Sequence, residues 1–296
     1  MSFSSEVKNE LAQMPATTGT LLALIRMNGS LLLGVDLQLV IVTSSARTAR
    51  AIYQMLLDLY EIRAEVTQEE ASLRKSYRVR VSGGLSDLLD DLQLTDSLLL
   101  DDGVPQLVLS RALFQADYLR GAFLSAGSVS NPERAYMLEI VSKNRKHAID
   151  LQMLLVNFGI LSALTESTKG WILYLSNAAV IADFLTTIGA THARLEFEAV
   201  KLLREMRGLA NRQANFEAAN ITKTVKASQE TIKAIDALIA ANQLPETLLD
   251  MATARLAHPE STLTELGALV SPPLSKSAVA RRLRKIEALA HKLSER

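Results

Sequence analysis

Two matching stretches of the sequence decide the fold: Leu21-Leu22-Ala23-Leu24-Ile25-Arg26-Met27-Asn28-Gly29 and Leu119-Arg120-Gly121-Ala122-Phe123-Leu124-Ser125-Ala126-Gly127. They belong to two copies of one unit, which occupy residues 21–176 at an offset of 98 positions for most of their length. Matched pairs include Gly29 and Gly127, Val42 and Ile140, Ser44 and Ser142, and Met55 and Met153. Near Tyr77 the offset falls to 94, as a shorter loop would give. Solenoid units run only about 20–50 residues, so this repeat predicts a duplicated domain.

The periodicity of apolar residues predicts the element order α-β-β-α-β-β-α in each copy. In the first copy, helices are expected at residues 17–28, 46–60 and 86–94, and strands at 31–33, 37–43, 62–67 and 77–82. Residues 34–36 and the charged segment 68–75 are expected to be loops. In the second copy, helices are expected at 113–125, 145–158 and 178–188, and strands at 128–130, 135–141, 160–166 and 171–176. The predicted class is α+β.

The helix that ends at Gly29 resembles, position by position, the motif of LAGLIDADG homing endonucleases, and its counterpart ends at Gly127. In that family the two motif helices pack through small residues, and each presents one acid that holds the metal ions for strand cleavage. The acid positions here are Asn28, a neutral amide that binds hard divalent cations weakly, and Ala126, which has no ligand atom. The resemblance implies a nuclease scaffold with no catalytic residue, no metal and no cofactor.

After the second copy the pattern becomes wholly helical, with helices expected at residues 192–207, 228–241 and 245–257. An Asn-rich polar stretch follows Gly208. It is either an ordinary polar linker or a hinge that contacts nucleic acid, because Asn and Arg suit base edges and phosphates. The candidate contact residues of this stretch are Asn211, Arg212, Asn215, Asn220 and Lys223.

Residues 262–270 and 276–293 have the proportions of a helix-turn-helix, joined by the turn Ser271-Pro272-Pro273. Val279, Leu283 and Ile286 share the inner face of the second helix. Hydroxyl and basic side chains near its start suit entry into the major groove, while a solvated basic helix is the alternative. The candidate DNA-binding residues are Ser275, Lys276, Ser277, Arg281, Arg282, Arg284 and Lys285.

Composition and charge exclude several classes of protein. The net charge is zero, yet residues 1–110 hold 9 basic and 14 acidic groups, and residues 271–296 hold 7 and 2. A basic end of this kind suggests contact with a polyanion, or a solvated helix face.

There is no cysteine, and the four histidines are scattered, so no metal site is predicted. No membrane span or signal-peptide pattern is present, which predicts a cytoplasmic protein.

Nearly the whole chain resembles the WhiA family, which joins a degenerate LAGLIDADG-type domain to a C-terminal helix-turn-helix. The stretches that carry the resemblance are residues 3–11, 25–30, 118–123, 127–132, 211–215, 223–225, 272–277 and 282–285. The resemblance implies sequence-specific binding of double-stranded DNA at the nucleoid, transcriptional regulation, and a role in cell division and chromosome segregation, with sporulation in some relatives. Where the family usually has Gly-Val-Asn-His, this chain has Ala278-Val279-Ala280-Arg281, which leaves a different DNA target open.

The predicted domains are a duplicated LAGLIDADG-like domain at residues 1–188, a helix and polar linker at 189–224, and a helix-turn-helix domain at 225–296. The two repeats of the first domain cover about residues 17–94 and 113–188. The predicted function is a non-catalytic, DNA-binding transcriptional regulator. The alternatives are a division- or nucleoid-associated adaptor whose acidic N-terminal domain binds a protein partner, and an active LAGLIDADG endonuclease. The sequence does not indicate an oligomeric state.

Overall fold

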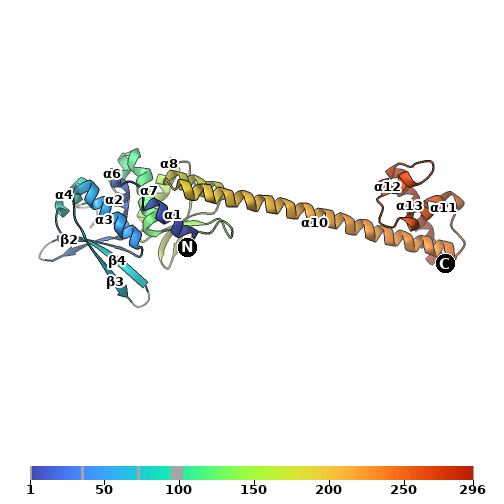
Figure 1. Ribbon diagram of the computed structural model, residues 1–296, viewed down its shortest axis with the longest axis horizontal. Helices are drawn as coiled ribbons and strands as arrows, with labels where there is room; N and C mark the ends of the chain where they lie inside the picture. Colours follow the sequence, from blue (N-terminus) through green and yellow to red (C-terminus); the bar gives the residue numbers. More distant parts are fainter. Residues whose placement is uncertain (1, 35–36, 72–73, 95–102, 296) are drawn as a thin grey trace. The chain divides into compact units, whose positions relative to one another are not determined.

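The computed structural model of the chain describes residues 2–34, 37–71, 74–94 and 103–295 (Figure 1). They form two compact units, Met1–Arg204 and Glu205–Arg296. The first unit contains two four-stranded sheets flanked by helices, and the second is entirely helical. The predicted α+β class, with a duplicated domain followed by an all-α domain, is confirmed. None of the described helices is long and apolar enough to cross a membrane.

The two repeats have the same topology. The first consists of α2 (Thr18–Asn28), β1 (Gly29–Leu33), β2 (Leu37–Thr43), α3 (Ala46–Tyr60), β3 (Glu65–Ala71), β4 (Arg74–Val81) and α4 (Leu85–Asp91). The second consists of α7 (Ala112–Ala126), β5 (Gly127–Val129), β6 (Leu138–Ser142), α8 (Arg145–Asn157), β7 (Ala163–Ser167), β8 (Gly170–Leu175) and α9 (Ala178–Thr187). The antiparallel sheets follow the orders β1-β2-β4-β3 and β5-β6-β8-β7. A short helix, α6 (Gln106–Ser110), precedes the second repeat.

Strand register corrects the alignment of the two repeats by one residue. Gly29 pairs with Ile41 in the first sheet, and its counterpart Gly127 pairs with Ile140 in the second. The structural equivalent of Ile140 is therefore Ile41 and not Val42. The physical reason is a longer connection between β5 and β6 than between β1 and β2. Part of the predicted 34–36 turn lies outside the described residues.

The predicted loop at residues 68–75 is wrong, because β3 and β4 extend through most of it. The register pairs Gln68 with Tyr77 and Glu69 with Ser76, while residues 72–73 lie outside the described residues. One charged side chain of this segment, Glu69, is paired across the strands, and a second cross-strand pair lies just outside it. Arg78 lies 2.8 Å from Glu69, and Arg80 lies 3.5 Å from Glu65. Such cross-strand pairs stabilise a sheet that is exposed on one face.

Helices α2 and α7 pack closely at the centre of the first unit (Figure 1). Small residues allow the approach, because a Cβ on Gly121 would overlap the carbonyl oxygen of Thr20 and the side chain of Ala23. The Thr20 hydroxyl also donates a hydrogen bond of 3.1 Å to the Asp117 carbonyl oxygen. Both helices are apolar on most sides and are buried along most of their length. Their crossing joins the two repeats into one core.

An unpredicted N-terminal helix, α1 (Phe3–Leu11), also contributes to this core. Phe3, Val7 and Leu11 lie on one buried face, and the ring of Phe3 lies 6.1 Å from that of Phe197. The Glu10 carboxylate accepts hydrogen bonds from the backbone N–H groups of His192 and Ala193 at 2.7 and 2.9 Å. A carboxylate at this point satisfies free donors at a helix N-terminus. Helix α1 therefore caps the helix that follows both repeats.

That helix, α10 (Thr191–Ala240), continues through Gly208, so the predicted break after Gly208 is wrong. The helices expected at residues 192–207 and from 228 are parts of one helix, and the polar stretch between them is helical too. A mid-helix Gly costs only about 1 kcal/mol, and the stretch contains no proline. The first turns of α10 belong to the first core through Ala193 and Phe197, and its last turns belong to the second through Ile235 and Leu238.

The second unit adds three shorter helices to the end of α10. They are α11 (Glu246–Ala257), α12 (Leu263–Leu269) and α13 (Lys276–Ser294), close to their predicted positions. Their shared core contains Met251, Leu266, Val279, Leu283 and Ile286. Each of these helices contributes at least one side chain to this core, so the unit has a hydrophobic core of its own.

The α2–α7 crossing yields a prediction for Gly121→Ala. The added methyl group has no room against Thr20 and Ala23, so the free energy of unfolding should fall by about 2–3 kcal/mol. Gly83→Ala is the matched control, since a Cβ at Gly83 meets nothing within 4 Å. Denaturant unfolding of the two variants measures the difference. Equal stability of both variants would show that the helices can separate without cost.

Candidate functional site

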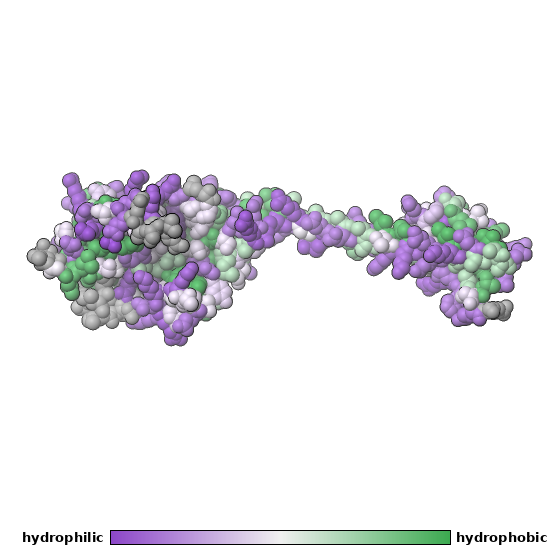
Figure 2. Space-filling view, turned by 90° about the horizontal axis from the view of Figure 1, so that it is seen from below, coloured by the Kyte–Doolittle hydropathy of each residue, from purple (hydrophilic) through white to green (hydrophobic). Residues whose placement is uncertain are grey.

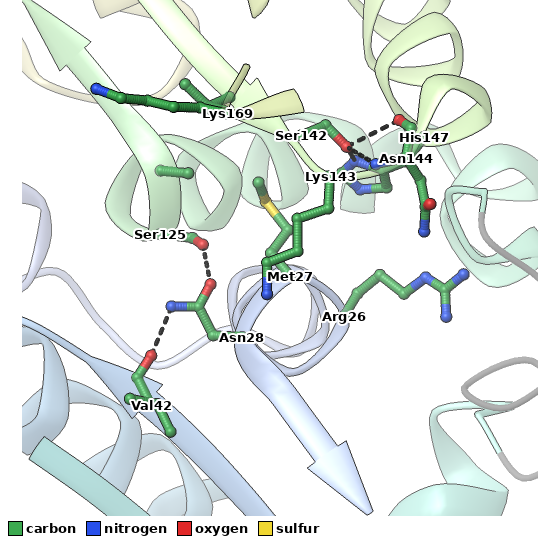
Figure 3. Close-up of a pocket in the computed structure, with 12 residues that line it drawn as sticks. Arg26, Met27, Asn28, Val42, Ser125, Ser142, Lys143, Asn144, His147 and Lys169 are labelled. Atoms are coloured by element: carbon green, nitrogen blue, oxygen red, sulfur yellow. Dashed lines mark hydrogen bonds between the residues drawn. The ribbon is translucent and has the colours of Figure 1, made fainter. Parts of the chain in front are cut away.

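The C-terminal ends of α2 and α7 meet at a cavity of about 480 Å³ between the two repeats (Figure 3). Both degenerate acid positions, Asn28 and Ala126, line it. The structure thus brings together the two positions that the motif resemblance singled out. Lys143, which follows β6, points toward the end of α2 in Figure 3.

The Asn28 amide forms a bridge between the two repeats. Its Nδ2 group donates a hydrogen bond of 2.7 Å to the Val42 carbonyl oxygen in its own repeat. Its Oδ1 atom accepts a hydrogen bond from the Ser125 hydroxyl in the other repeat. An aspartate at this position would place a carboxylate oxygen against the Val42 carbonyl oxygen, two acceptors with no proton between them. The surroundings therefore fit an amide and disfavour an acid.

The charges around the cavity do not fit the divalent metal that the nuclease fold implies. Arg26, Lys143 and Lys169 contribute to its lining, and none of the described residues that line it carries a carboxylate. Hard cations such as Mg²⁺ need carboxylate or other oxygen ligands, and basic side chains repel them. Within the described residues, no cluster of three or more His, Asp or Glu side chains could hold a metal. The sequence analysis missed Lys143 and Lys169 because both follow strands in loops, where no periodic pattern marks them.

His147 lies beside the cavity and is buried. Its Nε2 atom is 2.8 Å from the Tyr118 hydroxyl, and its Nδ1 atom is 3.0 Å from the Ser142 hydroxyl. Burial lowers the pKa of His147 from its ordinary value of 6.5 to about 4, and the charge of Arg26 acts in the same direction. The imidazole is therefore neutral near pH 7. Its two hydrogen bonds hold β6 and α8 against α7.

The sheet faces that would meet DNA in a homing endonuclease carry little free positive charge. In the first sheet, Val79 and Val81 face the core, so Arg78 and Arg80 lie on the opposite face, each beside a glutamate. The strands of the second sheet contain no lysine or arginine. Phosphate groups need uncompensated cations. The described side chains of these faces therefore carry little uncompensated positive charge.

In the second unit, α12 and α13 form a tight helix-turn-helix. Thr262 and Glu265 form a capping box at the start of α12, and the Ser275 hydroxyl caps α13. The Leu274 N–H donates a hydrogen bond of 2.8 Å to the Gly267 carbonyl oxygen. A Cβ on Gly267 would overlap the Leu274 carbonyl oxygen, so this glycine permits the close turn. The caps and the turn fix where α13 begins.

The two faces of α13 differ sharply. Val279, Leu283 and Ile286 are buried, whereas the basic side chains of the other face are solvent-exposed. The predicted DNA-binding residues on the exposed surface are Ser275, Lys276, Ser277, Arg281, Arg284 and Lys285, and Arg282 is half-buried. Within the part of the chain that the structure describes, none of these basic groups forms an ion pair with a carboxylate. Their positive charge is therefore available to an anionic partner.

Lys223 of α10 lies with this basic surface. Together with Lys276 and Arg284 it lines a hollow of about 460 Å³ in the second unit. The other candidates from the polar stretch, Asn211, Arg212, Asn215 and Asn220, are exposed along α10 and do not line the hollow. At 3.6 residues per turn they point in several directions, so they do not share one face of the helix. The structure therefore groups only Lys223 with α13.

The shifted pKa of His147 predicts how stability depends on pH. Between about pH 6.5 and 4 the unfolded chain binds a proton at this residue that the folded chain does not. The free energy of unfolding should therefore fall as the pH drops through this window, by up to about 3 kcal/mol. Urea unfolding from pH 7 to 4.5 should show a shallower loss for His147→Gln than for the wild type. An unchanged slope in His147→Gln would contradict the assignment.

Comparisons with known proteins cover the whole chain. The WhiA N-terminal LAGLIDADG-like domain matches residues 16–95, the WhiA LAGLIDADG-like domain matches 115–207, and the WhiA C-terminal HTH domain matches 210–290. A "Probable cell division protein WhiA" from Lactococcus lactis subsp. lactis is 52% identical over 99% of this chain and 98% of its own length. One from Streptococcus suis is 43% identical over 100% of both chains.

The fold agrees with these matches. The crystal structure of full-length WhiA from Thermatoga maritima aligns with a TM-score of 0.61 and 24% identity over 99% of each chain. At that identity the alignment shows the fold, and the sequence relatives show the family. The HTH match covers the last part of α10, all of α11 and α12, and most of α13, the helix that carries the exposed basic face. The chain belongs to the WhiA family.

Proposed function

We propose that the protein is a non-catalytic, sequence-specific DNA-binding protein that regulates transcription. The exposed and unpaired basic face of α13 is the observation that supports this most directly. A helix-turn-helix places its second helix in the major groove, where side chains of its first turns reach base edges. The capped start of α13 holds Ser277 and Arg281 on the exposed face of those turns.

In this proposal the basic residues divide between reading bases and binding phosphates. Arg281 lies one turn after Ser277, and an arginine there can form two hydrogen bonds to guanine. Arg284 and Lys285 lie a turn further on, where a recognition helix usually meets the sugar-phosphate backbone. Lys223 and Lys276, which share a hollow with Arg284, would bind phosphate as well. Of the linker candidates, the proposal uses only Lys223.

The proposed cellular role rests on the relatives. The proteins from Lactococcus lactis and Streptococcus suis are both named as probable cell division proteins. We infer that this chain acts at the nucleoid in the cytoplasm and links transcription to cell division and chromosome segregation. A genome-wide map of DNA occupancy would test this role, since its binding sites should cluster at genes of those processes.

A specific observation favours one alternative for the N-terminal domain. The described side chains of its sheets carry little free positive charge, and Leu32 and Val42 are 49% and 37% exposed there. A surface of this kind suits a protein partner better than a phosphate backbone. The alternative is therefore a division-linked adaptor in which DNA binding is secondary. Loss of the cellular function in a Leu32→Lys variant that still binds DNA normally would favour it.

The proposal predicts that the protein does not cut DNA. Supercoiled plasmid incubated with Mg²⁺ or Mn²⁺ should remain intact, because none of the described residues that line the cavity at Asn28 and Ala126 carries a carboxylate. Agarose electrophoresis of the plasmid measures nicking and linear product. Metal-dependent cleavage that is lost in Asn28→Ala would overturn the prediction and restore the endonuclease hypothesis.

The division of labour on α13 gives a second prediction. Arg281→Ala should cost about 1–3 kcal/mol of binding free energy on the specific site and little on a scrambled duplex. Lys285→Ala should weaken both duplexes about equally and lower the salt dependence by about one unit. Binding titrations on both duplexes across a salt series measure these effects. An equal loss on both duplexes for Arg281→Ala would show that Arg281 does not read bases.

A further inference from the structure

Helix α10 carries a heptad pattern that the proposed function does not use. Large apolar side chains recur at every seventh residue, at Leu195, Leu202, Leu209 and Phe216. The positions four residues after each of these hold Ala199, Met206, Gln213 and Asn220. An alternation of four and three residues over four heptads is the a/d pattern of a coiled coil. The first set then occupies d positions, and the second set occupies a positions.

This a/d stripe is exposed to solvent along its whole length. The four d side chains are 57%, 58%, 60% and 65% exposed, and Met206 is 58% exposed. Where α10 packs on the first unit, Phe197 and Arg204 face that unit. Both occupy the heptad position opposite the a/d seam. Figure 2 shows apolar side chains interrupting the hydrophilic surface of α10. Within the described part of the chain, the side-chain hydrogen bond of the stripe is that of 2.6 Å from the Gln213 amide to Glu217 of the same helix.

We propose that this stripe is a homodimer interface, in which α10 pairs with α10 of a second copy as a parallel two-stranded coiled coil. Leucine is a usual d residue of two-stranded parallel coiled coils. The polar a residues Gln213 and Asn220 would fix the register, because like amides hydrogen-bond to each other only when the two helices are aligned. Polar a residues also disfavour larger assemblies. A second copy of the chain therefore suits this stripe better than an apolar peptide of another kind.

Charges beside the stripe fit the same partner. In a parallel coiled coil, a g residue lies beside the e residue five positions later on the opposite helix. Arg212 at g would then lie beside Glu217 of the second copy, an attractive pair. The preceding g residues, Glu198 and Glu205, would lie beside Leu203 and Ala210 of the second copy. No like charges oppose each other in this register.

Sedimentation equilibrium of the full chain without DNA tests self-association. The wild type should sediment as a dimer, and Leu209→Glu should raise the dimer dissociation constant at least tenfold. Ile221→Glu is the matched control, because Ile221 is 64% exposed on the same helix but lies outside the a/d stripe. This control should remain dimeric. Far-UV circular dichroism confirms that both variants keep their helices.

Single-cysteine variants test the parallel register, since the chain has no cysteine of its own. In a parallel dimer, equivalent d residues face each other, so Leu202→Cys and Phe216→Cys should both form disulfide-linked dimers under mild oxidation. Ile221→Cys should not. The charge reversal Arg212→Glu should weaken the dimer, and the double variant Arg212→Glu/Glu217→Arg should restore it.

Three outcomes would overturn the proposal. A monomeric wild type at tens of micromolar would show that the stripe does not bind a second copy. Equal weakening by Leu209→Glu and Ile221→Glu would place the interface elsewhere. Cross-linking of at most one of the two d-position cysteines would exclude the parallel register. None of these measurements involves DNA, so the proposed function can fail or hold independently of this result.

Discussion

The close packing of α2 against α7 is the contact on which the first unit depends. Gly19 and Gly121 let the two backbones approach, and this approach decides where each sheet lies and where the helices end. Because both helices end at the same cavity, Asn28 and Ala126 both line it although 98 residues separate them in the sequence. The crossing needs small residues in the helices but no acid at their ends. The scaffold can therefore keep its geometry while the chemistry at those ends changes.

Periodicity and self-similarity were enough to predict the fold, whereas features set by single contacts were not. The repeat and its apolar spacing predicted the helix at Ala46–Tyr60 to the residue, because its burial follows from local pattern alone. Helix α1 was missed since its nine residues become helical only against a core that forms much later in the chain. The continuity of α10 was missed because polar composition suggested a linker, while helix propensity decided the outcome. The Asn28 bridge and the hydrogen bonds of His147 join groups on different helices and strands, a tertiary arrangement that no local sequence pattern encodes.

The two units differ in whether their exposed basic side chains lie beside carboxylates. In the first, the exposed arginines of β4 lie beside glutamates of β3, so the sheet presents little net charge. In the second, α13 keeps its buried side apolar, and within the described residues Arg281, Arg284 and Lys285 form no ion pair with a carboxylate. Pairing neutralises a surface and stabilises it modestly, whereas unpaired cations repel one another unless an anion is present. The net charge of the whole chain is zero. It averages over a sheet face of the first unit, where charges are paired, and the exposed face of α13, where positive charges can bind an anion.

The capping of α10 by Glu10 has a consequence for the order in which the chain is made. The hydrogen bond from His192 to Glu10 spans 182 residues, and Phe3 lies beside Phe197. At synthesis rates of about 5–20 residues per second, α1 leaves the ribosome about 10–40 s before its partner helix exists. During that interval the apolar face of Phe3, Val7 and Leu11 lacks part of its final cover. Helix α1 therefore completes its packing only after the last repeat and the start of α10 have been synthesised. Until then its apolar face is an exposed segment that a ribosome-bound chaperone can bind.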